Sequence, residues 1–512
     1  MVDFRHMYGN SLTIGIVCFL VGALAELLLF INKVCWNKRR WLASVSLVMT
    51  AFATGYFSFQ YPSVVTILIA FLSIYRVINN VREVDGRMVE AYLKRSSRRT
   101  FKWLGAAQII IILVWYIFRH YSFQVSTDSI YAGFGLIILI SSLLILINTI
   151  VNVIKTKSPS RQIIADKDLP DVTLAISARN EDRNLEDCLN MAIASDYPKL
   201  EIIVLDDCSQ DRTAEIIRNF AHDGVRFIQS EDNKDNWLDK NKAYQTLLEQ
   251  ASGQLILFSG VDARFQTKTI RHLVEVYSLK NVTMMSVLPR RVGSGIIAAF
   301  IQPMRYWWEM AVPKYLLNRP PTLSTCWLVN REALIKMGGF KSITRQIVPE
   351  EHLAKLLNMD GKYAFIRNDS DLEVSTQKSF HSQWLTAVRT RYPQAHRRPE
   401  KVALRSLIMI IFWIAPFIAL PLTIFSLNVP NLYIAALSIS IAALIAANVF
   451  ICIVTNPDMT LISLINFPIE VVIDLIALNI SMYRYEFDEV VWKGRNISGT
   501  VMHVEPSLPA ID

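Results

Sequence analysis

The sequence predicts an α/β domain with a Rossmann-like sheet, flanked by α-helical transmembrane segments. Three observations support this. Hydrophobic residues make up 52% of the 512 residues and charged residues only 19%, whereas about 25% charged residues is usual for a soluble domain. Several apolar stretches approach the roughly 20 residues that a helix needs to cross a bilayer. Between them, short β-rich runs alternate with amphipathic stretches, which is typical of βαβ units.

Eight apolar stretches are candidates for membrane spans. Five precede the α/β region, at about 11–32, 42–58, 62–80, 103–118 and 130–153, and three follow it, at about 405–427, 431–454 and 459–482. The loops after the first, third and fifth stretches are rich in Lys and Arg, which places the α/β region in the cytoplasm. We therefore expect an N-terminal transmembrane region over 1–157, a cytoplasmic domain over 158–400 and a C-terminal transmembrane region over 401–512.

The net charge of +9 is explained by this topology. Most of the excess lies in the first 153 residues, beside apolar stretches, so we expect no nucleic-acid partner. Three full C-terminal spans would put the C-terminus outside the cell. Pro416, Pro421 and Pro468 interrupt two of these stretches, so we expect that one of the three does not cross the membrane. The six cysteines form no CxxC pair, which excludes a disulfide framework.

Polar residues follow three of the β-rich runs. The runs 172–176, 202–205 and 255–258 are followed by residues 177–181, 206–211 and 259–263, and a further acidic segment spans 349–353. Parallel sheets bind ligands at the carboxyl ends of their strands. An acidic pair after a strand is more often a helix cap and turn, so the order and spacing of the four segments carry more weight than any one of them.

Two helical stretches combine aromatic rings with basic or apolar residues. The stretch 296–317 contains Tyr306, Trp307 and Trp308, and the stretch 380–399 contains Trp384, Tyr392 and four arginines. Such mixtures suit a membrane surface, where we expect both helices to lie. The alternative is a core helix with a solvated charged face.

The four segments together resemble the membrane-bound family-2 inverting glycosyltransferases with a GT-A fold. The nearest likeness is to hopanoid-associated enzymes and, more loosely, to ceramide glucosyltransferases. It covers about 170–400, and the ending Trp492-Lys493-Gly494-Arg495 is similar to the WKGR ending of many such enzymes. The resemblance implies a hexosyltransferase-like enzyme of the bacterial cytoplasmic membrane that passes a sugar from a nucleotide-diphosphate sugar to a lipid or lipid-linked acceptor with inversion.

The resemblance also implies a nucleotide-binding set. Arg179, Asn180 and Glu181 match the family's "ARNE" motif, which lines the nucleotide pocket. Asp206 and Asp207 match its "DDxS" acids, which contact the base and the ribose. A carboxylate at a strand end can accept hydrogen bonds from a base N–H or from ribose hydroxyls.

Two further positions depart from the family pattern. Lys240 matches the lysine that approaches the diphosphate, but Asp239 stands where the family has glycine; the alternative is an exposed loop lysine. The first position of the family's DxD metal motif is Gly260, and only Asp262 remains. One carboxylate plus diphosphate oxygens can hold Mg²⁺ or Mn²⁺, so we expect Asp262 to be the metal ligand, with weaker binding or altered geometry as a possibility.

The acidic segment supplies the catalytic carboxylate. Leu353 and Gly361 lie at the family's offsets when they are counted from Glu350, and not when they are counted from Glu351. The resemblance therefore implies Glu350 as the general base, with Glu351 as its neighbour. A base of this kind contributes about 10²–10⁴-fold to the rate.

A downstream stretch separates two kinds of glycosyltransferase. Processive synthases carry a Gln-x-x-Arg-Trp motif, which this sequence lacks, and residues 384–394 instead resemble a hopanoid-associated stretch. Arg389 or Arg391, beside Trp384, could contact the diphosphate or the acceptor. Two alternatives stay open: a processive polysaccharide synthase, and a catalytically degenerate nucleotide-sugar-binding scaffold, which Gly260 would support.

Overall fold

The computed structural model describes two parts of the chain. These are residues 18, 21–22, 45 and 48–56, and then 127–159, 162–230, 237–293, 302–317, 319–424, 429–487, 490–493 and 495–497. The chain divides into two units, Met1–Val125 and Ser126–Asp512. In the first unit, residues 48–56 are helical, within the predicted span 42–58. The predicted spans 11–32, 62–80 and 103–118 lie almost wholly outside the described residues.

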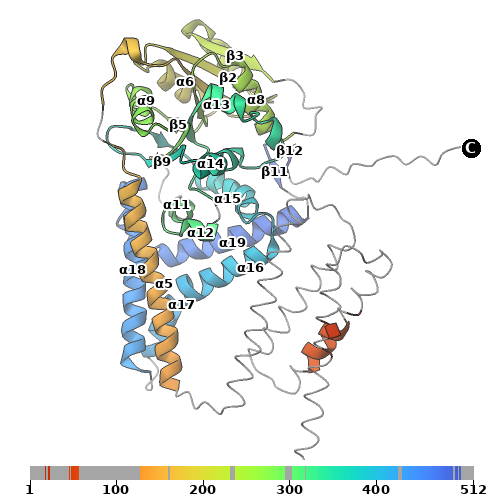
Figure 1. Ribbon diagram of the computed structural model, residues 1–512, viewed down its shortest axis with the longest axis vertical. Helices are drawn as coiled ribbons and strands as arrows, with labels where there is room; N and C mark the ends of the chain where they lie inside the picture. Colours follow the sequence, from red (N-terminus) through yellow and green to blue (C-terminus); the bar gives the residue numbers. More distant parts are fainter. Residues whose placement is uncertain are drawn as a thin grey trace, which may run out of the picture. The chain divides into compact units, whose positions relative to one another are not determined.

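A seven-stranded sheet forms the core of the α/β region of the second unit, in the upper part of Figure 1. Its strands, in the order of the sheet, are β3 (Val225–Gln229), β2 (Leu200–Asp206), β1 (Val172–Ala178), β4 (Leu255–Ser259), β8 (Cys326–Asn330), β6 (Met284–Leu288) and β9 (Tyr363–Arg367). The first four strands run parallel, as do β6 and β9, whereas β8 is antiparallel to both of its neighbours. The three predicted β-rich runs are therefore confirmed as adjacent parallel strands.

Hydrophobic cores cover both faces of this sheet. Successive residues of a strand point to opposite faces, so Leu174 and Ile176 enter one core while Ala175 enters the other. The helices of this region are α6 (Leu185–Ile193), α7 (Thr213–Asn219), α8 (Asp239–Gln250), α9 (Thr269–Lys280), α13 (Arg331–Lys336) and α14 (Pro349–Met359). Near-continuous apolar strands are expected where a parallel sheet is buried on both faces.

Two small sheets complete the α/β region. One contains β5 (Ala263–Arg264), β10 (Ser375–Thr376) and β7 (Arg290–Arg291), and the other is the antiparallel hairpin of β11 (Val491–Trp492) and β12 (Arg495–Asn496). The first sheet connects the residues after β4 with those after β6 and β9. It therefore extends the edge at which the polar loops lie.

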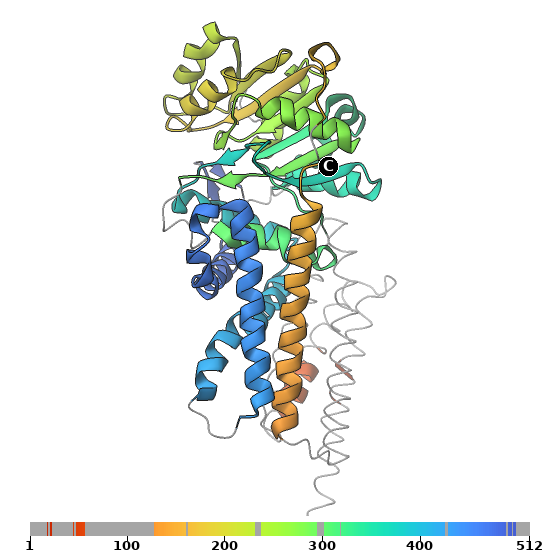
Figure 2. The same cartoon turned by 90° about the vertical axis from the view of Figure 1, so that its left-hand side faces the viewer.

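Three described helices are long and apolar enough to cross a membrane: Asp128–Lys155, Pro399–Thr423 and Asn431–Thr455. They correspond to α5 (Thr127–Lys155), to α16 (Pro399–Ile408) continued by α17 (Ala415–Ile424), and to α18 (Asn431–Thr455). Both views show α5 and α18 side by side (Figures 1 and 2). The predicted stretches 130–153, 405–427 and 431–454 are thus confirmed as apolar helices of sufficient length.

The helix between α16 and α17 is continuous despite its prolines. Residues Met409–Ile414 form a π-helical stretch that joins the two. Pro416 has no N–H to donate to the preceding turn, and such a loss is commonly absorbed by a local widening of the helix. The prolines therefore distort this helix without ending it.

The third C-terminal stretch behaves differently. It contains two short 3₁₀ turns, Pro457–Met459 and Ile462–Leu464, followed by α19 (Phe467–Glu486), and it is not one of the three candidate spans among the described residues. Instead, α19 packs along α15 (Phe380–Gln394). That one C-terminal stretch does not cross the membrane stays a prediction.

Three aromatic residues of the stretch 296–317 do not lie on the surface. The described helices there are α11 (Gln302–Met310) and α12 (Lys314–Leu317). Tyr306, Trp307 and Trp308 are at most 6% exposed, and the indole N–H of Trp308 donates to Asp474 over 2.8 Å. The prediction that these rings face the membrane surface is wrong, because α19 and the π-helical stretch cover them.

The prediction of a membrane-surface position is also wrong for Arg391 and Tyr392 of α15. Its Arg391 and Tyr392 are 6% and 1% exposed, and both side chains contact acids of α19. Composition could not separate the two cases, because rings and arginines suit both a membrane surface and a buried polar interface.

Candidate active site

The loops after β1 and β2 interlock at the edge of the sheet. Asn180 and Cys208 have φ values of 49° and 52°, which turn the chain sharply at each strand end. The Asn180 N–H donates to Ser209 Oγ over 3.0 Å, and its side-chain oxygen accepts from the Gln210 N–H over 2.9 Å. The structure thereby brings the two predicted nucleotide-binding segments together.

The two adjacent acids of the second segment have different environments. Asp206 is 1% exposed and accepts hydrogen bonds from Gln229 at 2.9 Å and from the Ser209 N–H at 3.2 Å. Asp207 lies 3.9 Å from Arg179 and 3.0 Å from Arg495. Burial raises the pKa of Asp207, and Arg495 opposes this rise. Asp206 therefore fixes the loop, while Asp207 faces basic side chains.

The hairpin of β11 and β12 docks on these acids. The Lys493 ammonium lies 2.5 Å from Glu181, and the Arg495 guanidinium lies 2.7 Å from Asp239 and 3.0 Å from Asp207. Sequence reasoning assigned no role to either basic residue. The only signal was the similarity of 492–495 to the family ending, of which Gly494 lies outside the described residues.

Asp262 lies in the loop after β4. Its Oδ2 accepts from Thr376 over 2.7 Å and lies 3.2 Å from the Lys378 ammonium. Burial alone would raise the pKa of Asp262. Lys378 and Thr376 lower this pKa by a larger amount, so it lies below its ordinary value. A Cβ at Gly260 would lie 2.7 Å from Asp262 Oδ1, so an acid at position 260 would require the Asp262 side chain to move.

The described residues contain no group of three His, Cys, Asp or Glu side chains with metal-binding geometry. Asp262 Oδ1 has no hydrogen-bond partner among them, so this oxygen is available to a cation. Mg²⁺ is commonly held by one or two carboxylates together with substrate phosphates and water. The donor set fits a cation bound in that way, through Asp262 alone on the protein side.

The helix α14 presents the two glutamates. Pro349 occupies the first helical turn, where its missing N–H costs nothing, and Glu350 and Glu351 follow in that turn, where the helix dipole favours negative charge. Glu350 is 2% exposed and lies 3.1 Å from the Lys240 ammonium. Burial lowers the pKa of Lys240, and Glu350 opposes this. Lys240, predicted at the diphosphate, thus contacts the predicted base.

Glu351 belongs to a separate buried network. It lies 3.6 Å from Arg319, which also makes two hydrogen bonds to Glu309, at 2.7 and 2.8 Å. Burial raises the pKa of Glu351, although Arg319 lowers it. Arg319 and Glu309 side chains are each 2% exposed. This network anchors the start of α14.

Three residues of α15 are predicted to contact the diphosphate or the acceptor, and in the structure each has different surroundings. Arg391 forms an ion pair with Asp474, and the Arg389 guanidinium stacks 5.0 Å from the Trp492 ring centroid. Trp384 is half-buried on the same helix and does not line the described cavity beside it. Arg389 thus joins α15 to the C-terminal hairpin.

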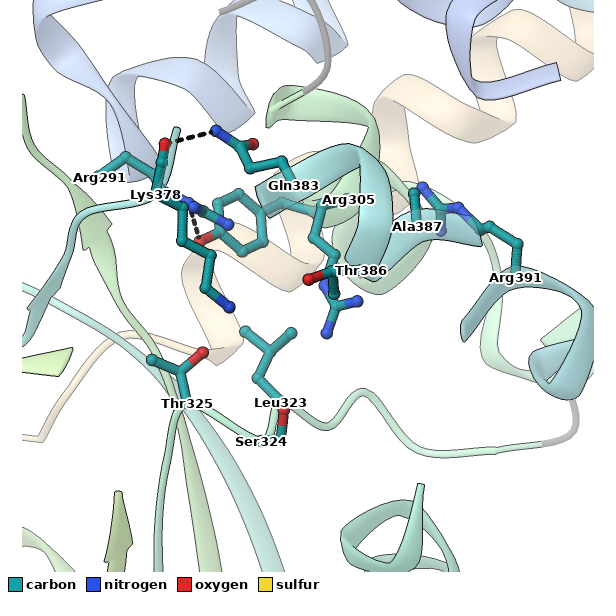
Figure 3. Close-up of a pocket in the computed structure, with 11 residues that line it drawn as sticks. Arg291, Arg305, Leu323, Ser324, Thr325, Lys378, Gln383, Thr386, Ala387 and Arg391 are labelled. Atoms are coloured by element: carbon teal, nitrogen blue, oxygen red, sulfur yellow. Dashed lines mark hydrogen bonds between the residues drawn. The ribbon is translucent and has the colours of Figure 1, made fainter. Parts of the chain in front are cut away.

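A basic cavity lies beside Asp262, between the start of β8, β7, α11 and α15 (Figure 3). Its lining includes the basic residues Arg291, Arg305, Lys378 and Arg391 and the hydroxyl-bearing residues Ser324, Thr325 and Thr386. Three of these basic residues were missed by sequence reasoning. They are scattered along the chain, so no local motif could identify them.

Part of the chain is similar in sequence to known glycosyltransferases. Residues 173–338 match the family described as Glycosyl transferase family 2. Glycosyltransferase AglE of Haloferax volcanii is 35% identical over 94 residues, which cover 18% of this chain and 30% of that protein. The 4,4'-diaponeurosporenoate glycosyltransferase of Staphylococcus aureus is 24% identical over 184 residues, which cover 35% of this chain and 48% of that protein.

The chain thus spans between about a third and a half of the length of these curated relatives. Among solved structures, the mannosyltransferase PcManGT of Pyrobaculum calidifontis, in complex with GDP-Man and Mn²⁺, gives a TM-score of 0.44 at 16% identity, covering 70% of this chain and 99% of that one. Together, the family match and the sheet of mainly parallel strands establish that the chain contains a family-2 glycosyltransferase domain with a GT-A-like fold.

Proposed function

We propose that the protein is an integral-membrane glycosyltransferase that transfers one sugar from a nucleotide-diphosphate sugar to a lipid or lipid-linked acceptor with inversion. The observation that carries the proposal is the pairing of a buried carboxylate, Glu350, with Lys240 over 3.1 Å. Both belong to the domain that carries Asp262 and the two nucleotide loops. The helices of the same unit are apolar enough to cross a membrane, which supports a lipid acceptor.

The nucleotide would bind at the ends of β1 and β2. Glu181 and Asp207 would accept hydrogen bonds from ribose or base, while Arg179 and Asn180 shape the loop around them. Asp206 is already engaged by Gln229 and Ser209, so it would support the loop. Lys493 and Arg495, which now hold the acids, would be close to the incoming diphosphate.

A divalent cation, Mg²⁺ or Mn²⁺, would be held by Asp262 on the protein side and would supply positive charge to the diphosphate. Lys240 and Arg389 both carry positive charge near Glu350. They would add to the stabilisation of charge that develops on the leaving diphosphate.

Glu350 would act as the general base. The acceptor hydroxyl would lose its proton to the carboxylate as its oxygen bonds to the anomeric carbon, and the bond from that carbon to the diphosphate would break on the opposite face. This single displacement inverts the configuration. The Lys240 ammonium, 3.1 Å from the carboxylate, would hold Glu350 in place beside the acceptor.

The C-terminal half of the chain supports a cytoplasmic catalytic domain. Two apolar helices, Pro399–Thr423 and Asn431–Thr455, lie between the domain and its docked C-terminal hairpin. Two crossings return the chain to its starting side. The basic loops of the N-terminal region place that side in the cytoplasm, in a multi-pass arrangement of the bacterial cytoplasmic membrane.

The substitution Glu350→Gln tests this function. We expect sugar transfer to fall by about 10²–10⁴-fold, while binding of the nucleotide sugar persists, because the amide keeps the shape and loses the basic oxygen. Transfer would be followed by mass spectrometry of lipids from membranes with and without the protein, which also names the sugar and the acceptor.

Glu351→Gln is the matched control, one residue along the same helical turn. Because Glu351 contacts Arg319, its substitution should lower stability more than turnover. Near-normal transfer by Glu350→Gln together with loss in a folded Glu351→Gln protein would reverse the assignment of the base. A long polymer as product would instead support a processive synthase.

A further inference from the structure

The basic cavity beside Asp262 carries more positive charge than its acidic neighbours balance. Lys378 pairs with Asp262, and Arg391 pairs with Asp474. Arg291 and Arg305 also line the cavity, and neither forms an ion pair within the described part of the chain. Two guanidinium groups therefore lack a carboxylate partner there.

Arg291 is the more deeply buried of the two, with 6% of its surface exposed. Its Nε donates to the Tyr306 hydroxyl over 2.9 Å. Its Nη1 has no hydrogen-bond partner among the described residues. Leaving a buried donor without a partner has a free-energy cost, which is larger when the group is charged. An anion in the cavity would remove this cost.

Arg305 faces the same space from α11. Within the described residues its guanidinium makes one long hydrogen bond, 3.5 Å to Thr390. Burial lowers the pKa of Arg305 to about 10. Glu309 raises this pKa, and the positive charge of Arg391 lowers it. Figure 3 shows the ends of the Arg305 and Lys378 side chains directed into one space above Leu323. Such convergence of cations is unfavourable without an anion between them.

The cavity has the size and the donors for a phosphate group. Its volume is about 30 Å³, whereas about 10–15 Å³ holds a single water molecule. It therefore has room for more than one water molecule. The hydroxyls of Ser324, Thr325 and Thr386 line it beside the guanidinium groups, and arginine matches the geometry of phosphate oxygens.

Its position separates it from the nucleotide loops. Thr325 directly precedes β8, which lies on the side of β4 away from β1 and β2. The opposite wall is formed by α11 and α15, and α11 contacts α5 and α18, two of the candidate membrane helices. A phosphate at this place can therefore belong to a lipid.

We propose that this cavity binds the phosphate of an acceptor lipid that carries its reacting hydroxyl elsewhere in the head group. The inference rests on the proposed function and narrows its acceptor to anionic lipids. Lys240 connects the two sites, because it pairs with Glu350 and also lies within electrostatic range of Arg305. A head group held by its phosphate would thus present a hydroxyl toward Glu350.

Binding of lipid probes to the full chain in dodecylmaltoside micelles tests the proposal. The probes are dioleoylphosphatidylglycerol, which has a phosphate and a free hydroxyl, and dioleoylglycerol, which has the hydroxyl alone. We expect calorimetry to give at least about tenfold tighter binding of the phosphatidylglycerol. Arg305→Gln should weaken that binding by about 10- to 100-fold and leave the affinities for UDP and GDP unchanged.

Arg212→Gln is the matched control. It removes the same charge from an exposed position on the nucleotide side, where Arg212 pairs only with Glu215 among the described residues. We expect it to change neither lipid affinity. Equal binding of the two lipids, or equal effects of the two substitutions, would overturn the proposal. Weaker UDP or GDP binding with unchanged lipid binding in Arg305→Gln would assign the cavity to the donor diphosphate instead.

Two measurements keep the test decisive if Arg305→Gln does not fold. Arg305→Lys keeps the charge and should still bind phosphatidylglycerol more tightly than dioleoylglycerol. With the wild-type protein, inorganic phosphate should compete with phosphatidylglycerol, and absence of competition would count against the site. A protein that binds the lipid but transfers no sugar would refute the proposed function and leave the phosphate site standing.

Discussion

The proposed active-site edge has two ends, which differ in how their charges are balanced. The nucleotide end consists of the loops after β1 and β2, and the cavity end consists of the basic cavity beside Asp262. At the nucleotide end, Glu181 and Asp207 are matched by Lys493 and Arg495 of the C-terminal hairpin. At the cavity end, Arg291 has a buried N–H without a partner among the described residues. Basic residues of the chain itself balance the acids of the nucleotide end, whereas at the cavity end Arg291 and Arg305 have no carboxylate partner among the described residues.

The largest expected effect tests whether the carboxylate of Glu309, on the helix α11 beside the cavity, stabilises the protein. Glu309→Gln removes the carboxylate that accepts two hydrogen bonds from buried Arg319. Loss of one partner of a buried ion pair typically costs about 3–5 kcal/mol. We expect a reduction of this size in the free energy of unfolding, measured by chemical denaturation in detergent.

Glu215→Gln provides the contrast at the nucleotide end. Its ion pair with Arg212 is exposed, with side-chain exposures of 58% and 74%, so the expected effect is at most about 1 kcal/mol. Equal losses for the two substitutions would mean that the Glu309–Arg319 pair does not anchor α14.

The nucleotide end was largely predictable from the sequence, because its parts are local. Strand ends can be recognised from short apolar runs, and the carboxyl ends of adjacent parallel strands meet at one edge. Asn180 and Asp207 could therefore be placed together before the fold was known. The exchange of hydrogen bonds between the two loops follows from the same adjacency.

The cavity end was not predictable, because its partners are distant in the chain. Arg391 pairs with Asp474, and Arg291 contacts Tyr306 across two elements. A sequence pattern gives the chemistry of each side chain but not its partner. The same reason explains why the rings of α11 were expected at the membrane and are found in the core.

The next prediction concerns the hairpin that closes the nucleotide end. Arg495 is shared by Asp207 and Asp239, and under the proposed function it would transfer to the diphosphate when a ribose hydroxyl binds Asp207. Arg495→Gln should therefore raise the KM for the nucleotide sugar by about 3- to 10-fold, as expected for a partly exposed cation, with kcat nearly unchanged.

Initial rates measured over a range of donor concentrations would check this. Arg218→Gln is a suitable control, because Arg218 is a basic residue of α7 whose guanidinium lies over the Phe227 ring. A lower KM in Arg495→Gln would mean that the hairpin competes with the nucleotide, and the comparison between the two ends would then need to be reversed.

The smallest expected effect concerns pH and the excess positive charge at the cavity end. His396 follows α15, and burial lowers its pKa to about 3, with Lys401 and Lys355 adding to the effect. The unfolded value is about 6.5, so the unfolded chain takes up the proton first as the pH falls. The stability that depends on neutral His396 is thus complete above about pH 6.5 and is lost as the pH falls toward 3.

His396→Gln removes this group, so the decrease in Tm between about pH 7 and about pH 5 should be smaller than in the wild type, by about 2 °C. Exposed His381 provides the control, since His381→Gln should leave the decrease unchanged. Thermal unfolding at matched ionic strength measures both. An equal decrease in the wild type and in His396→Gln would show that His396 is protonated without cost, and that the basic residues around α15 do not oppose a further positive charge.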